Sequence, residues 1–136
     1  MADLTITAAD VIKTDSTLIA EGTAGATVTA GQPVYKDSTA SGKLKPADAD
    51  VLATAAAVGI ALHGASDGQP LRYATGGNLT LSAVMTIGAV YVVSTTAGGI
   101  APVADLASGD YVTLLGVATT TSNLKLSVSV SGIAKP

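Results

Sequence analysis

The residues with the clearest potential for acid–base or nucleophilic chemistry lie close together, where His63 is followed by Ser66 and Asp67. A serine hydrolase uses such a trio: the histidine takes the serine proton and the carboxylate orients the histidine. Here His63 is the chain's single histidine, and the glycines around it are typical of a loop. We therefore interpret His63 as an exposed turn residue and predict no catalytic residue in this stretch.

Acidic side chains offer a second kind of chemistry, because Asp37, Asp48 and Asp50 could supply oxygen ligands to a calcium ion. Their spacing does not follow the calcium-loop pattern, and the chain's one glutamate, Glu21, lies upstream of all three. The glycine clusters match neither a phosphate-binding loop nor a dinucleotide-binding motif. We interpret the aspartates as solvated turn residues and predict no metal and no cofactor.

The composition favours an assembly-forming protein over an enzyme. Hydrophobic residues make up 48% of the 136 residues, yet the chain has no Phe and no Trp, and charged residues reach only 12%. A core without large aromatic side chains stabilises a lone subunit modestly, so we predict that subunits cover one another in a homo-oligomer. The net charge of −3 and the seven scattered basic residues argue against a nucleic-acid partner.

Residues 73–104 carry no charge, which raises the question of a membrane segment. Glycine, serine and threonine interrupt this stretch, whereas a spanning helix needs about 20 predominantly apolar residues. We therefore predict no membrane partner. The absence of cysteine is compatible with assembly in a reducing cytoplasm.

The elements that would position these residues are strands. Apolar and polar residues alternate at 124–131 and again at 78–82, which predicts strands with one buried face. Residues 58–77 read as strand, glycine turn and strand, and short helical turns are expected within 47–57 and 103–107. The pattern predicts an all-β fold, as a small β-barrel or a sandwich.

An internal repeat organises the chain from Gly31 onward. Tyr35 and Tyr91 are 56 residues apart, as are Pro46 and Pro102, while Gly59 and Gly116 are 57 apart. Two copies are too few for a solenoid. They predict a duplicated strand-turn-strand unit that closes into one body spanning residues 31–136.

Residues 1–30 precede the repeat and consist of short β-prone pieces separated by small polar residues. We predict that they form an extended arm, with a first strand packed on its own barrel as the alternative. The arm's candidate contacts with a partner are its aliphatic residues Leu4, Ile6, Val11, Ile12, Leu18 and Ile19. A second candidate contact is the loop that carries His63, Asp67 and Gln69, where the two repeats differ in length.

Taken in order, these segments resemble a known family. The chain is similar to tailed-phage head decoration (capsid cement) proteins, the small β proteins related to the lambda-type decoration protein. The similarity rests on residues 7–11, 22–35, 58–62, 64–70, 97–102 and 109–118.

This resemblance implies a trimeric β-barrel or β-tulip on the outer surface of the expanded virion capsid, assembled in the host cytoplasm. Its partner would be the major capsid protein, which the N-terminal arm would contact by strand addition. Bound copies would bridge neighbouring capsid subunits and hold the shell against the pressure of the genome. Deleting residues 2–20 is then expected to leave a folded body that no longer decorates heads.

Two other functions compete with this one. A fibre-like module that binds a receptor or glycan on the virion surface would need an exposed aromatic platform, and the chain has four dispersed tyrosines. A virion hydrolase would need a nucleophile with its partners, which we do not predict. The sequence therefore favours a structural protein that is not an enzyme.

Overall fold

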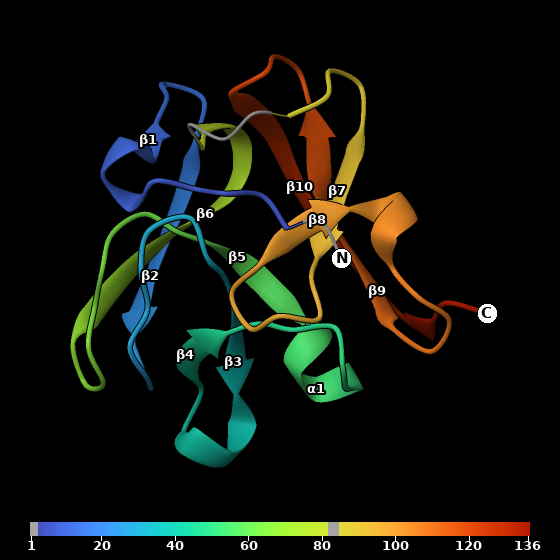
Figure 1. The fold of residues 1–136 in the computed structure, drawn as a ribbon. Helices are drawn as coiled ribbons and strands as arrows, with labels where there is room; N and C mark the ends of the chain where they lie inside the picture. Colours follow the sequence, from blue (N-terminus) through green and yellow to red (C-terminus); the bar gives the residue numbers. More distant parts are fainter. Residues whose placement is uncertain (1–2, 82–84) are drawn as a thin grey trace.

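The computed structural model describes residues 3–81 and 85–136 and confirms the all-β class. Ten strands form one antiparallel sheet that curls into a half-barrel (Figure 1). The strands are β1 (Ile12–Lys13), β2 (Leu18–Thr23), β3 (Pro33–Asp37), β4 (Lys43–Pro46), β5 (Ala57–Ala61), β6 (Pro70–Thr80), β7 (Val90–Val93), β8 (Ile100–Pro102), β9 (Tyr111–Ala118) and β10 (Asn123–Ala134).

Short helical turns connect the strands where the sequence predicts them. The helix α1 (Leu52–Ala55) lies within 47–57, and the 3-10 turn η3 (Val103–Asp105) lies within 103–107. Two further 3-10 turns are η1 (Ala8–Asp10) and η2 (Ser38–Ala40). The strand predicted at 78–82 is confirmed for residues 78–80, where β6 ends. Leu81 lies beyond the strand, and Ser82 lies outside the described residues. Among the described residues, no helix has the length and apolar character needed to cross a membrane.

The sheet order confirms the duplication. Successive neighbours are β4-β3-β5-β6-β10-β9-β7-β8, so the strands of the second copy repeat those of the first in reverse order. The two copies meet where β6 pairs with β10, along Gly76–Thr80 of β6. Two successive four-stranded units of the chain therefore join into one sheet through their last strands.

The register of the repeat differs from the sequence prediction by one residue. Val34 pairs with Gly59 in the first copy, and Tyr91 pairs with Gly116 in the second, so the equivalent residues of β3 and β7 are 57 apart. The predicted equivalence of Tyr35 and Tyr91 is therefore wrong. Each copy has a register shift directly after this pair. Both tyrosines nevertheless pack against the same apolar cluster, in which Tyr91 is buried and Tyr35 is half-buried.

The hairpin of β5 and β6 lies between two apolar clusters. Ile60 and Ala74, which pair across the hairpin, belong to the larger cluster, which also holds buried residues of β7, β9 and β10. Their neighbours Ala61 and Tyr73 belong to a second cluster with buried residues of β3 and β4. Burial on both faces explains why this hairpin reads as apolar without clean alternation.

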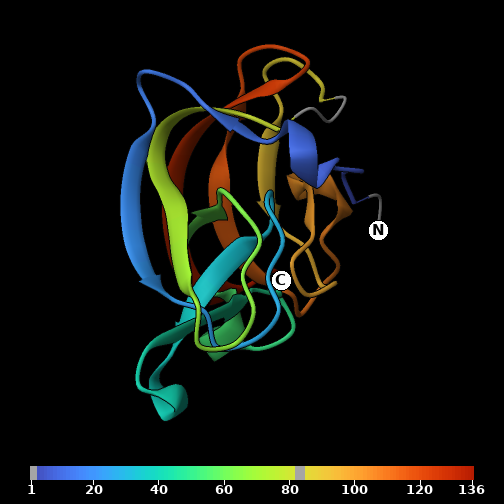
Figure 2. The same cartoon turned by 90° about the vertical axis from the view of Figure 1, so that its left-hand side faces the viewer.

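The N-terminal segment is packed on the body, so the prediction of a separate arm is wrong and the alternative of a first strand on its own barrel describes the chain. Strand β2 pairs with β6 along Pro70–Gly76, and Figure 2 shows the two strands side by side. Nearer the N-terminus, Leu4 N donates to Ile100 O at 2.7 Å. Residues 3–30 and 31–136 therefore do not form two separable parts, and residues 1–2 lie outside the described residues.

Candidate interaction site

The six aliphatic residues predicted as partner contacts fall into two groups. Leu4 and Ile6 are half-buried against the larger apolar cluster, and Val11 is part of that cluster. All three help to complete the protein's own core and do not form an exposed arm surface. The other three residues point outward, with exposed fractions of 58% for Ile12, 64% for Leu18 and 43% for Ile19.

A cavity of about 300 Å³ lies beside these exposed residues, between the N-terminal segment and the sheet. We call it the β1–β6 cavity and define it by its lining residues Val11, Ile12, Lys13, Ile19, Leu62, His63 and Arg72. The fold therefore brings together three of the predicted arm residues and the predicted loop histidine. Lys13, Leu62 and Arg72 were not predicted as site residues.

Strand pairing explains how these residues meet. Leu62 lies opposite Arg72, since Leu62 N donates to Arg72 O at 3.0 Å. On the other side of β6, Ile19 pairs with Ala74, two residues beyond Arg72. Residues two apart on a strand share a face, so Ile19, Arg72 and Leu62 project from the same face of the sheet. Val11, Ile12 and Lys13 reach the cavity from the segment that leads into β1 and from β1 itself.

His63 is held by two hydrogen bonds to the backbone. Its Nε2 accepts from Arg72 N at 3.0 Å, and its Nδ1 lies 2.9 Å from Gly64 O. A carbonyl oxygen can only accept, so Nδ1 carries the proton and the ring is the neutral tautomer with Nε2 as acceptor. Both ring nitrogens are therefore occupied in positioning the start of the loop.

Residues 64–68 match the Gly-X-Ser-X-Gly pattern of a nucleophile turn, although we predict no catalytic residue in this stretch. In that motif the serine lies on a sharp turn from a strand into a helix. Here the pentapeptide connects the antiparallel strands β5 and β6, and Ser66 N donates to Gln69 Oε1 at 2.8 Å. The backbone therefore lacks the strand-to-helix turn that the sequence motif indicates. The ring nitrogens of His63 bind backbone atoms of Gly64 and Arg72.

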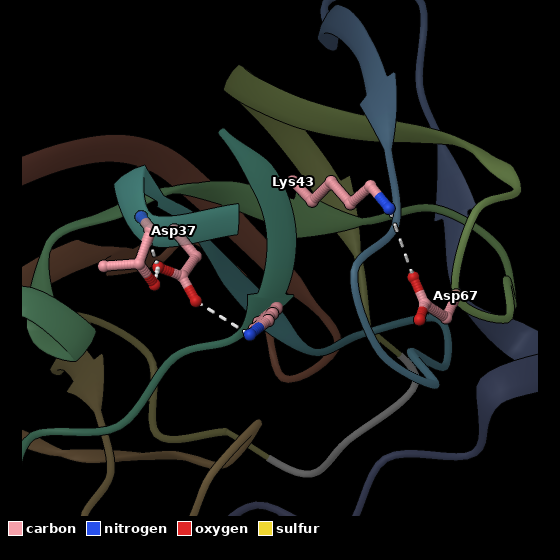
Figure 3. Close-up of polar contacts among 5 residues, drawn as sticks. Asp37, Lys43 and Asp67 are labelled. Carbon is pink, nitrogen blue, oxygen red and sulfur yellow. Dashed lines mark hydrogen bonds and ion pairs between the residues drawn. The ribbon is translucent and has the colours of Figure 1, made fainter. Parts of the chain in front are cut away.

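Asp67 and Gln69 lie farther along the loop and do not line the cavity. The carboxylate of Asp67 is 3.7 Å from Lys43 Nζ, a pair with exposed side chains (Figure 3). Gln69 O accepts from Ala24 N at 2.8 Å. These contacts fasten the loop to β4 and to the chain after β2, so the predicted loop contacts divide into His63 at the cavity and two residues away from it.

The cavity combines aliphatic and cationic lining residues. Four of its lining residues are aliphatic, and two, Lys13 and Arg72, carry a positive charge. The nearest ion pair is between Arg72 Nε and Glu21 at 3.9 Å, and the two side chains are 66% and 60% exposed. Exposed pairs of this kind contribute little, so the cations remain available to a partner.

Two of the three aspartates considered as calcium ligands have carboxylates that bind other groups. Asp37 is 2.7 Å from Lys45 Nζ, whereas Asp48 accepts from Thr54 Oγ1 and Asp50 N. Within residues 3–81 and 85–136, no three acidic or histidine side chains form a group that could hold a metal ion.

The pair of Asp37 and Lys45 predicts a pH-dependent stability (Figure 3). The hydrogen bond from Lys45, followed by those from Thr39, lowers the pKa of Asp37 from 3.8 to about 2. A carboxyl with a depressed folded pKa stabilises the fold above its unfolded pKa, and this contribution disappears as the pH falls through the folded value. We expect Asp37→Asn to be less stable than the wild type above pH 4, with the difference vanishing towards pH 2. Urea unfolding from pH 6 to pH 2 measures this, and a constant difference would contradict it.

No protein-family model matches the chain, and no curated protein matches its sequence. The fold and the cavity therefore define its class by themselves. The chain is an all-β protein with exposed aliphatic residues on two N-terminal strands, beside a cavity lined by aliphatic and cationic residues.

Proposed function

We propose that this protein is a decoration, or cement, protein of a tailed-phage head. It binds the outside of the expanded capsid, bridges major capsid protein subunits and stabilises the shell against the pressure of the genome. The resemblance of the ordered segments along the chain supports this proposal. The all-β fold is the kind that the resemblance implies.

The observation that carries the proposal is the exposed aliphatic surface of β1 and β2, made of Ile12, Leu18 and Ile19. Among the described residues, β2 pairs with β6 and with no other strand, so the outer edge of β2 is not paired with a strand. An open edge with exposed aliphatic side chains is a surface that a partner strand can extend. This mode of binding needs no free arm, because the receiving strand is already folded on the body.

A protein that bridges neighbouring subunits needs a second contact surface. Exposed aliphatic residues also occur at the start of α1 (Leu52 and the preceding Val51) and on the C-terminal half of β10 (Val130 and Ile133). Helix α1 lies against β10, so these residues come from neighbouring elements. We propose that this second surface serves self-association, with the trimer as the expected unit. Several copies of the capsid-binding surface in one oligomer would raise the overall affinity through avidity.

The alternative of a fibre-like glycan-binding module has less support. Such a module needs exposed aromatic rings. Of the four tyrosines, Tyr73 and Tyr91 are buried, and Tyr35 and Tyr111 are half-buried. The described surface therefore offers no aromatic platform of the kind that this function requires.

The experiment mixes the purified protein with undecorated heads assembled from the major capsid protein encoded nearest to this chain's gene. Expanded heads and unexpanded procapsids are compared by co-sedimentation. A decoration protein is expected to bind expanded heads in a fixed ratio to the capsid protein and to leave procapsids unbound. Absence of binding to expanded heads, or binding to glycans in its place, would contradict the proposal.

A further inference from the structure

The β1–β6 cavity combines two features that a partner would have to match. Its lining includes the aliphatic residues Val11, Ile12, Ile19 and Leu62 and the cationic residues Lys13 and Arg72. The whole chain has a net charge of −3, so these cations stand out against an acidic protein. Charge complementarity therefore favours a partner that carries a carboxylate next to an aliphatic group.

Nearby acidic residues do not cancel this charge. Asp10 and Asp15 flank β1 in the sequence, but neither lines the cavity. Glu21 approaches Arg72 at 3.9 Å through an exposed pair. Lys13 takes part in no ion pair among the described residues. Of the two cations, Lys13 is thus the one without a competing carboxylate.

The size and place of the cavity indicate what kind of molecule it takes. About 300 Å³ is at the lower end of the range for small-molecule sites, roughly 300–1,000 Å³. The cavity also adjoins Ile19 on β2, the strand whose outer edge is outside the ladder among the described residues. A strand added at that edge would place every second side chain on the face that carries Ile19.

We propose that the β1–β6 cavity binds an extended segment of the major capsid protein in which an aliphatic residue and an acidic residue are two positions apart. The aliphatic side chain fills the cavity, and the carboxylate pairs with Lys13 and Arg72. This inference rests on the proposed function for the source of the segment. Glu21 repels the incoming carboxylate. Removing its charge should therefore strengthen binding, whereas reversing the charges of Lys13 and Arg72 should weaken it.

The test is an NMR titration with three synthetic peptides that differ at one residue: Ac-Ser-Ile-Thr-Asp-Thr-NH2 and its Asn and Lys counterparts. We expect the Asp peptide to bind about tenfold more tightly than the Asn peptide, with the advantage decreasing at high salt. The largest shift changes should fall on residues that line the cavity. Equal affinity for the Asp and Asn peptides, or shift changes confined to other surfaces, would overturn the inference.

Matched variants separate the cavity from a general charge effect. We expect Lys13→Glu with Arg72→Glu to remove the preference for the Asp peptide, and Glu21→Gln to strengthen it about twofold. Lys36→Glu with Lys125→Glu makes the same change in net charge at two exposed lysines away from the cavity. An equal loss in this control pair would contradict the inference. If the Glu pair does not fold, as judged by its NMR spectrum, Lys13→Met with Arg72→Met replaces it.

The same variants distinguish this inference from the proposed function. If expanded heads bind the wild type and the Lys13→Glu, Arg72→Glu variant equally, the protein decorates heads but the cavity does not bind an acidic segment of the capsid protein. If the Asp peptide binds the cavity but no head binds the protein, the site is correct and the proposed function is wrong. Loss of head binding in the cavity variant, but not in the control pair, supports both.

Discussion

Replacing Leu18 and Ile19 together by threonine is expected to weaken binding to expanded heads at least about a hundredfold. The two side chains are 64% and 43% exposed on β2, so their apolar area is available to a partner and is not part of the core. Burying an exposed Leu or Ile side chain fully contributes about 1.5–3 kcal/mol. Threonine is β-branched, a shape that strands favour, so the fold should be retained. Co-sedimentation at dilute protein concentration measures the binding.

Ile87 provides the control for this prediction. It is 64% exposed, like Leu18, but lies just before β7 and far along the chain from β2. Ile87→Thr removes a comparable apolar area and is expected to leave head binding and the free energy of unfolding unchanged within about 0.5 kcal/mol. If the Leu18 and Ile19 variant binds as the wild type does, the capsid-binding surface is not on β2.

The second large effect concerns the fold. Gly59→Ala and Gly116→Ala are each expected to lower the free energy of unfolding by about 3 kcal/mol or more. A Cβ at Gly59 would overlap Ala74 O and lie 2.8 Å from Tyr73 Cδ2. A Cβ at Gly116 would overlap Lys125 O and lie 2.9 Å from Lys125 C. In both cases the obstacle includes backbone of the neighbouring strand, which cannot move aside without disturbing the sheet.

Gly64 is the matched control, because it lies in the loop after β5 and has no neighbour within 3.4 Å of an added Cβ. Gly64→Ala is expected to change the stability by less than about 1 kcal/mol. Urea unfolding followed by far-ultraviolet circular dichroism measures all three variants. A loss below 1 kcal/mol in both Gly59→Ala and Gly116→Ala would contradict the close packing of strands at the two equivalent bulges.

The duplication and the strand content could be predicted from the sequence, but the register could not. Alternation and glycine spacing identify β-strands and a repeat. A β-bulge, however, adds one residue to a strand without a distinctive residue type and reverses which residues face the core. In each copy the extra residue lies on the partner strand, Val58 in β5 and Leu115 in β9, so the pairing that matches Tyr91 with Val34 does not follow from the matching tyrosines.

The N-terminal segment shows a second limit. Alternating aliphatic residues such as Leu4 and Ile6 indicate that one face is covered, but the pattern does not say whether the cover is the same chain or a partner. In the structure the cover is the protein's own core. Deleting residues 2–20 would therefore remove β1, the start of β2 and part of the core cover. Because the deletion would also disturb the fold, a loss of head binding would not identify the contact surface. The substitutions at Leu18 and Ile19 test that surface instead.

The candidate site was predicted in part. His63, Val11, Ile12 and Ile19 could be chosen from their residue types and surroundings. Lys13 and Arg72 are far apart in the sequence, and they meet because β1 and β2 both pair with β6. Strand order of this kind depends on contacts between distant segments, so local sequence patterns do not reveal it.

Retention of DNA by heated heads tests the proposed function most directly. Undecorated, DNA-filled heads are mixed with saturating wild-type protein, and the temperature at which they release DNA is followed with a dye that DNA binding makes fluorescent. A cement protein holds neighbouring capsid subunits together, so the release temperature should rise as binding saturates. With the variant in which threonine replaces Leu18 and Ile19, the release temperature should equal that of undecorated heads. An unchanged release temperature at full occupancy by the wild type would contradict the proposed stabilising function.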